Sequence, residues 1–102
     1  MMHKIFTVYD EKAHAHMPPF FLPELGMAVR VFTDCCNDAE HKFGKHPHDY
    51  TLKLIGTYDD ATASITQDTK TIIGNGAEYI DRQPNKNDQL ALLEDTNEPL
   101  GP

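Results

Sequence analysis

The stretch Pro23-Glu-Leu-Gly-Met-Ala-Val-Arg-Val-Phe-Thr-Asp-Cys-Cys-Asn37 decides the fold, because it carries the clearest helical pattern in the chain. Its apolar residues recur at steps of three and four, which places them on one face of a helix. Pro23 suits a first helical turn and Asn37 offers a stop, so we expect one main helix between them. The apolar residues of this face are Leu25, Ala28, Val29, Phe32 and Cys36.

The other patterned segments indicate β-strands. Residues 4–9 are rich in β-branched and aromatic side chains on both faces, so we expect a central strand there, with its second face covered by a loop or a partner subunit. Residues 50–58 alternate and predict a second strand. Residues 63–66 predict a short third strand. Residues 71–73 begin a fourth, which Gly74-Asn75-Gly76 interrupts as a bulge or hairpin reversal before residues 77–80.

Two further segments connect these elements. Prolines at 18, 19 and 23 bracket residues 20–22, which we expect to be extended and without a regular hydrogen-bond ladder. The phenylalanines there either fasten the start of the helix to the sheet or anchor a protein partner. Residues 38–49 read as a loop in which Phe43 plugs the core. The prediction is an α+β fold of order β-α-β-β-β, with one main helix packed on an antiparallel sheet of about four strands.

The composition limits the size of the domain and its partners. The 102-residue chain carries 9 Lys and Arg against 16 Asp and Glu, a formal net charge of -7. This balance argues against a general nucleic-acid coat but leaves a local basic patch open. We expect an α+β domain over residues 1–80 and an acidic, disordered tail over residues 81–102. No apolar run approaches the roughly 20 residues of a membrane span, so we expect a soluble cytoplasmic protein without a membrane partner.

Histidines and cysteines are the residues from which a metal site or nucleophile would be built. Two His-X-His pairs, His14/His16 and His46/His48, lie in predicted loops without further ligands at finger-like spacing. The adjacent Cys35 and Cys36 are unsuited to an intrachain bridge and lack an orienting third group. We therefore assign no catalytic residue, metal or cofactor, and we expect the protein not to be an enzyme.

Several segments in order resemble the small non-structural protein of gokushoviruses, single-stranded DNA phages of the microvirus group. The resemblance covers about residues 4–80 and includes Lys4-Ile-Phe-Thr-Val-Tyr-Asp10, Pro18-Pro-Phe-Phe21, Phe43-Gly-Lys-His-Pro-His-Asp-Tyr50 and Ile55-Gly-Thr-Tyr-Asp-Asp60. It implies a phage early protein, absent from the virion, that acts in genome replication, in the change from duplex to single-strand synthesis and packaging. The resemblance supplies no catalytic residues.

Two hypotheses for function follow. In the first, the protein binds a viral or host replication protein in the bacterial cytoplasm, and it is able to act as a homodimer. The residues expected to contact that partner are Pro19, Phe20, Phe21, Phe43, His46 and Tyr50. In the second, the protein binds single-stranded DNA directly, through stacking rings and cations. The residues expected to contact DNA are Lys4, Lys45, Lys53 and Tyr58.

Overall fold

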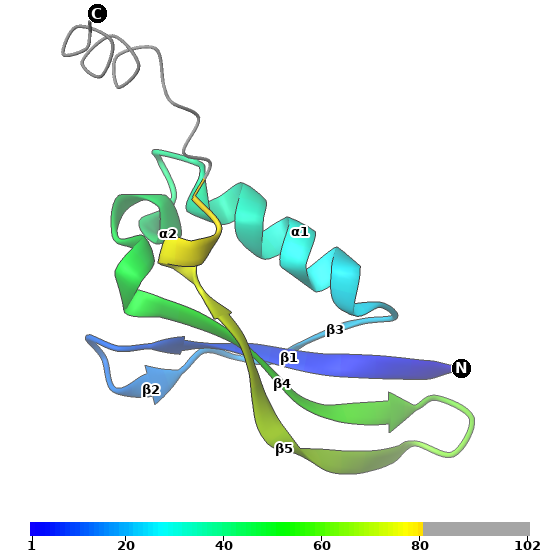
Figure 1. The fold of residues 1–102 in the computed structure, drawn as a ribbon. Helices are drawn as coiled ribbons and strands as arrows, with labels where there is room; N and C mark the ends of the chain where they lie inside the picture. The colour runs from blue at the N-terminus through cyan, green and yellow to red at the C-terminus, as the bar shows by residue number, and fades with distance from the viewer. Residues whose placement is uncertain (81–102) are drawn as a thin grey trace, which may run out of the picture.

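The computed structural model describes residues 1–80, with the side chains of all but residues 69 and 70 (Figure 1). Its five strands form one antiparallel sheet in the order β2-β1-β4-β5, and β3 also pairs with β1. The predicted α+β class, with one main helix on an antiparallel sheet, is confirmed, and the predicted tail lies outside the described residues. The elements are β1 (Met2–Asp10), β2 (Ala15–His16), β3 (Phe20–Leu22), α1 (Leu25–Cys36), α2 (Lys42–Lys45), η1 (Pro47–Asp49), β4 (Tyr50–Asp59), β5 (Ser64–Asn75) and η2 (Gly76–Glu78).

Helix α1 lies where the apolar periodicity predicts it. Glu24 occupies the N-cap position in an extended conformation, without a capping hydrogen bond from its side chain. Pro23 therefore precedes the helix, and the expectation that it belongs to the first turn is corrected. The backbone N–H of Asn37 donates to the carbonyl of Thr33 at 3.1 Å, and the Asn37 side chain donates to the same oxygen at 2.8 Å. These bonds satisfy the last turn, and the helix ends at the predicted residue.

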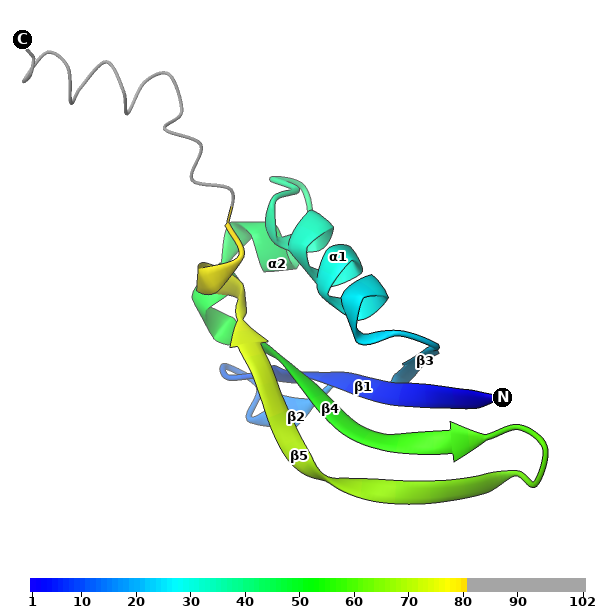
Figure 2. The same ribbon diagram turned by 45° about the vertical axis from the view of Figure 1, so that its right-hand side comes forward.

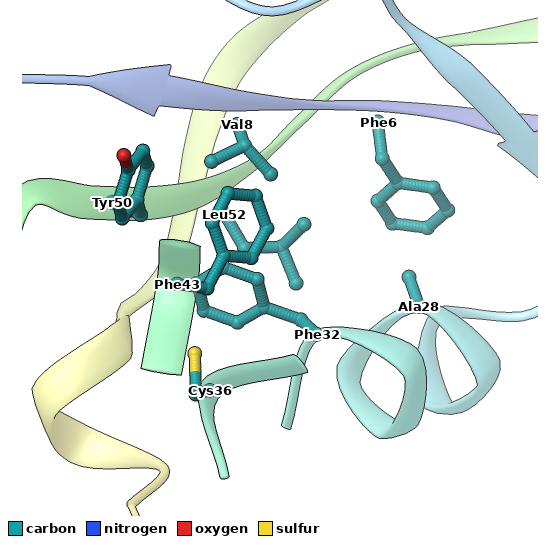
Figure 3. Packing of buried hydrophobic residues seen from close by; sticks show 8 residues of the cluster. All are labelled: Phe6, Val8, Ala28, Phe32, Cys36, Phe43, Tyr50 and Leu52. Atoms are coloured by element: carbon teal, nitrogen blue, oxygen red, sulfur yellow. The ribbon is translucent and has the colours of Figure 1, made fainter. Parts of the chain in front are cut away.

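The hydrophobic core lies between α1 and one face of the sheet. Figure 3 shows Phe6 pointing from β1 toward Ala28 on α1, with Leu52 beside Val8. Phe6 and Leu52 are fully buried. The core is completed by Phe32, Cys36, Phe43 and Tyr50. Strand β1 is central in this sheet, as predicted, because β4 flanks it on one side and the short strands β2 and β3 on the other.

Residues 38–49 are more ordered than the predicted loop, since they contain α2 and η1. His41 Nδ1 accepts the backbone N–H of Phe43 at 3.0 Å and so caps α2. The Phe43 ring then lies 4.5 Å from the ring of Tyr50 and 5.6 Å from that of Phe32, centroid to centroid. The cap thus fixes the backbone from which Phe43 extends into the core. The predicted burial of Phe43 in the core is confirmed.

The strands after β4 differ from the prediction. The expected third and fourth strands are one strand, β5, because the residues between them form a bulge and not a break. Gly56 pairs with Gln67, and Leu54 pairs with Thr71. Of the two alternatives for residues 74–76, the ladder shows a bulge beside Gly74, where Leu52 pairs with Gly74 and Lys53 with Ile72, and no hairpin reversal. The expected strand over residues 77–80 is absent from the structure, because β5 ends and η2 begins there. Asn75 ends β5 and caps η2, its side chain accepting the N–H of Ala77 at 2.9 Å.

Two short strands precede the helix, which corrects the predicted order. Residues 20–22 were expected to lack a ladder, yet β3 pairs with β1, with Phe21 opposite Ile5. The prolines flank the paired residues and do not lie among them, so each residue of β3 keeps its N–H. Figures 1 and 2 show α1 and α2 on one side of the sheet, and no helix within residues 1–80 covers the other side. No helix in that part of the chain is long and apolar enough to cross a bilayer.

Candidate functional site

The sheet surface turned away from α1 is called here the open face. On β1, its side chains alternate with the core residues Phe6 and Val8. Neighbouring strands add residues that pair in register with them, such as Lys53 opposite Thr7 and Tyr58 opposite His3. The open face comprises His3, Ile5, Thr7, Tyr9, His16, Met17, Pro19, Phe21, Lys53, Ile55, Tyr58, Ile65 and Gln67.

A bulge in β4 brings Tyr58 to this face. Ile5 pairs with Gly56 while the next residue, Phe6, pairs with Leu54, so Ile55 is an extra residue in the ladder. Such a bulge changes which face the later side chains of the strand occupy. Leu54 therefore packs toward the core, whereas Tyr58, four residues on, lines a pocket on the open face.

The centre of the open face is a groove of about 510 Å³ with an apolar floor. Ile5 and Thr7 on β1 are buried in this floor. The Thr7 hydroxyl donates to the carbonyl of Met17 at 2.7 Å, so this buried hydroxyl is already hydrogen-bonded. Phe21 and Ile65 stand at the sides of the groove and are exposed.

Aromatic rings flank the groove at both ends. At one end, the Tyr58 ring lies 5.7 Å from the ring of Phe21 and 6.0 Å from that of His3. At the other end, the Tyr9 ring lies 4.8 Å from that of His16. Lys53 Nζ lies 4.8 Å from the centroid of the Tyr9 ring, a cation–π contact, and 3.1 Å from His16 Nε2.

The charge on the open face differs from that of the whole chain. Among residues 1–80, no Asp or Glu lines the groove or the pocket beside Tyr58, and Lys53 adds a positive charge. The carboxylate of Asp60 reaches the His3 end, with Oδ2 2.9 Å from His3 Nε2 and Oδ1 2.7 Å from the amino group of Met1. The hydrogen bond from that amino group, followed by that from His3, lowers the pKa of Asp60. The Asp60 carboxylate is thus already paired with the amino group of Met1 and the ring of His3.

The residues predicted to contact DNA divide into two groups. Lys53 and Tyr58 lie on the open face. Lys4 lies on the opposite side of β1, because it alternates with Ile5 and pairs with Leu22, which packs against the core. Lys45 is exposed on α2, on the helix side of the sheet. The structure therefore places two of the four predicted residues on one face, at opposite ends of the groove.

The residues predicted to contact a protein partner are also separated. Pro19 and Phe21 line the groove of the open face, whereas Phe20 packs against the core. Phe43 and Tyr50 are 6% and 7% exposed, so their prediction as contact residues is corrected: both belong to the core. His46 is exposed beside η1 and does not line the groove.

His3, His16 and Ile65 carry no signal in the sequence that marks them as site residues, and Tyr9 is one aromatic residue among several there. The alternation along β1 places Ile5, Thr7 and Tyr9 on one face and would have found part of the group. His16 and Ile65 required the register of β2 and β5, which the sequence does not fix.

The histidines and cysteines do not form a combined site in the described part of the chain. Across residues 1–80, no three His, Cys, Asp or Glu side chains lie close enough to share a metal ion. Burial, and secondarily Cys35, raises the pKa of the Cys36 thiol to about 11. Burial, and secondarily Asp34 and Asp38, raises the pKa of Cys35. Both thiols are therefore protonated near neutral pH, the form that is a poor nucleophile.

The fold and this face define a small α+β domain with one helix-covered sheet surface and one open, aromatic-lined surface. The chain matches the family described as Phage ORF5 protein over residues 3–79, and it belongs to that family. The match includes α1 and, apart from Met2, every strand of the sheet. The prediction of a bacteriophage protein is confirmed, while the narrower assignment to gokushoviruses stays a prediction. Searches of curated proteins and of solved structures found no match.

Proposed function

We propose that this phage protein, of the gokushovirus type, assists viral genome replication in the host cytoplasm by binding single-stranded DNA across the open face. It works by contact, without catalysing a reaction. The observation that carries the proposal is the gathering of Tyr9, Phe21, Tyr58 and Lys53 on one surface that, within residues 1–80, has no carboxylate in its groove or pocket.

Stacking supplies most of the affinity in this proposal. Each unpaired base that stacks on an aromatic side chain contributes about 1–3 kcal/mol, and every base has a ring face to offer. Duplex DNA hides those faces within its own stack, so a surface of exposed rings favours single strands. Phe21 is 47% exposed, which leaves its ring accessible to a base.

The net charge of -7 limits the electrostatic share of the binding but does not oppose it locally. Charges separated by more than a Debye length of about 8–10 Å are largely screened at physiological salt. Among the described side chains, Lys53 is the lysine of the open face. In this proposal it contacts one phosphate. Because each phosphate contact to a single strand contributes about -0.7 to the slope of log K against log salt, we expect a shallow slope.

The test is a fluorescence-anisotropy titration of the full chain with a labelled oligothymidylate at several salt concentrations. We expect saturable binding, with a slope that Lys53→Gln makes shallower by about 0.7. Lys45→Gln is the matched control, since it removes the same charge from α2 and leaves the slope unchanged. Absence of saturable binding at low salt, or equal effects of the two variants, would overturn the proposal.

A second candidate function is docking of a viral or host replication protein on the same face. The observation favouring it is the apolar floor of the groove, to which Ile5 and Ile55 contribute and which suits an inserted apolar side chain. Under this alternative, wild-type protein does not bind oligothymidylate but binds a replication protein, and Ile55→Glu abolishes that binding. Light scattering on the same samples reports whether the chain forms a homodimer.

A further inference from the structure

We propose that the pocket bounded by His3, Phe21, Tyr58 and Ile65 holds one unpaired nucleobase of the bound strand. This inference, which rests on the proposed function, assigns a base-binding subsite to one end of the open face. The pocket has a volume of about 240 Å³ and is here called the Tyr58 pocket.

Four strands converge to build the Tyr58 pocket. Tyr58 on β4 pairs in register with His3 on β1 and with Ile65 on β5. Phe21 reaches the pocket from β3, which joins the sheet on the far side of β1. Since each wall comes from a paired strand, the backbone that carries the rings is in place before any ligand binds, which lowers the entropic cost of binding.

The arrangement of the rings suits a flat aromatic guest. The planes of Phe21 and Tyr58 are inclined at 76°, and those of His3 and Tyr58 at 37°. The three rings therefore do not stack flat against one another, and ring surface remains for a guest in the pocket. Ile65, which is 64% exposed, forms an apolar edge at the opening. A base that enters exchanges water for contact with rings and an isoleucine side chain.

His3 is held in position by a group outside the pocket. Its Nε2 lies 2.9 Å from Asp60 Oδ2, so one ring nitrogen is committed to that carboxylate and the ring orientation is set. The remaining walls offer ring surface and an aliphatic side chain, and the polar groups of the lining residues are the second ring nitrogen of His3 and the Tyr58 hydroxyl. We therefore expect the pocket to favour a nucleotide that carries a base over an abasic one, with little preference among the four bases.

Lys53 lies within reach of a strand anchored in the Tyr58 pocket. The pairing partners of Tyr58 and Lys53 on β1 are His3 and Thr7, four residues apart, or about 13 Å along the strand. At the rise of about 3.4 Å per stacked nucleotide, this distance corresponds to at most about four nucleotides. One short segment can thus place a base in the pocket and a phosphate beside Lys53.

The experiment compares oligothymidylate with an abasic oligonucleotide that has the same number of phosphates and no bases. Anisotropy titrations use the full chain as wild type, Tyr58→Ala and Tyr58→Phe. We expect Tyr58→Ala to weaken binding of oligothymidylate by about 5- to 150-fold, the range that corresponds to one stacked base. Binding of the abasic oligonucleotide stays unchanged, and Tyr58→Phe, which keeps the ring, binds both like wild type.

Phe21→Ala gives a second test that does not depend on Tyr58→Ala folding, because this side chain is about half exposed. It should weaken binding of oligothymidylate and spare the abasic oligonucleotide. Val31→Ala is its control, since Val31 is an exposed apolar residue on α1, 51% accessible and outside the open face. The base-binding pocket is overturned if Phe21→Ala weakens binding of both oligonucleotides equally. It is also overturned if the wild type binds the two oligonucleotides with the same affinity. Either result leaves the proposal of DNA binding in place. Failure of the wild type to bind either oligonucleotide overturns the proposed function itself.

Discussion

Phe20 and Phe21 are neighbours in the chain, yet they lie on opposite faces of the sheet. Phe20 stacks on Phe6 with ring centroids 5.6 Å apart and packs against the core under α1. Phe21 meets Tyr58 at 5.7 Å on the open face. Successive side chains of a strand point to opposite faces, so pairing of β3 with β1 is what divides the two rings. One ring consequently stabilises the fold while the other is available to a ligand.

This division predicts different effects for the two single variants. Phe20→Ala should lower the free energy of unfolding by about 3 kcal/mol, because it removes a ring packed against the core. Phe21→Ala should cost less than about 1.5 kcal/mol, since half of this side chain is already in water. Urea unfolding of each variant measures both values. Equal losses would mean that both rings serve the fold alike.

Periodicity was sufficient to predict the long elements of this fold. Helix α1 and strands β1 and β4 carry enough residues for the period of the apolar side chains to be visible. The short strands β2 and β3 have two and three residues, and they exist because β1 offers them a partner. In α2 the decisive features are a histidine cap and a close backbone approach at Gly44, neither of which has a periodic signature.

The candidate site could be predicted only in part, for a related reason. Strict alternation along β4 groups Tyr58 with Leu52 and Leu54, and so with the core. The extra residue Ile55 breaks that alternation and brings Tyr58 beside His3 and Ile65. A bulge depends on the ladder between two strands, so a single strand's sequence does not reveal it. Lys53 precedes the bulge, and its position does not depend on it.

Two glycines should respond in opposite ways to alanine. At Gly44, a Cβ would overlap the backbone carbonyl of Asp38, which cannot move without disturbing the turn before α2. Gly44→Ala should therefore destabilise the protein by about 1–3 kcal/mol. At Gly26 in α1, a Cβ would meet nothing within 4 Å. Gly26→Ala should stabilise by up to about 1 kcal/mol, because alanine is the better helix former.

Thermal or urea unfolding of the two glycine variants checks this prediction, and each serves as the control for the other. Both changes add a single methyl group, so a difference in sign between them isolates the local surroundings. A stable Gly44→Ala protein would show that the connection between α1 and α2 is looser than the structure indicates.

Cys36 should make the protein less stable in alkaline solution. Burial, with a smaller effect of Cys35, raises the pKa of this thiol from 9.0 to about 11. Between those two pH values the unfolded chain has released the thiol proton and the folded chain still holds it. The contribution of this thiol to the free energy of unfolding is therefore fully present below about pH 9. It is lost as the pH rises toward 11, by at most about 1.4 kcal/mol per pH unit.

Urea unfolding under reducing conditions across this pH range measures the slope of stability against pH. Cys36→Ala should make that slope flatter. The substitution also lowers stability at neutral pH, because it removes a core side chain. The two proteins share every other side chain, so an identical slope with and without the Cys36 thiol would show that the thiol ionises alike in the folded and unfolded chains.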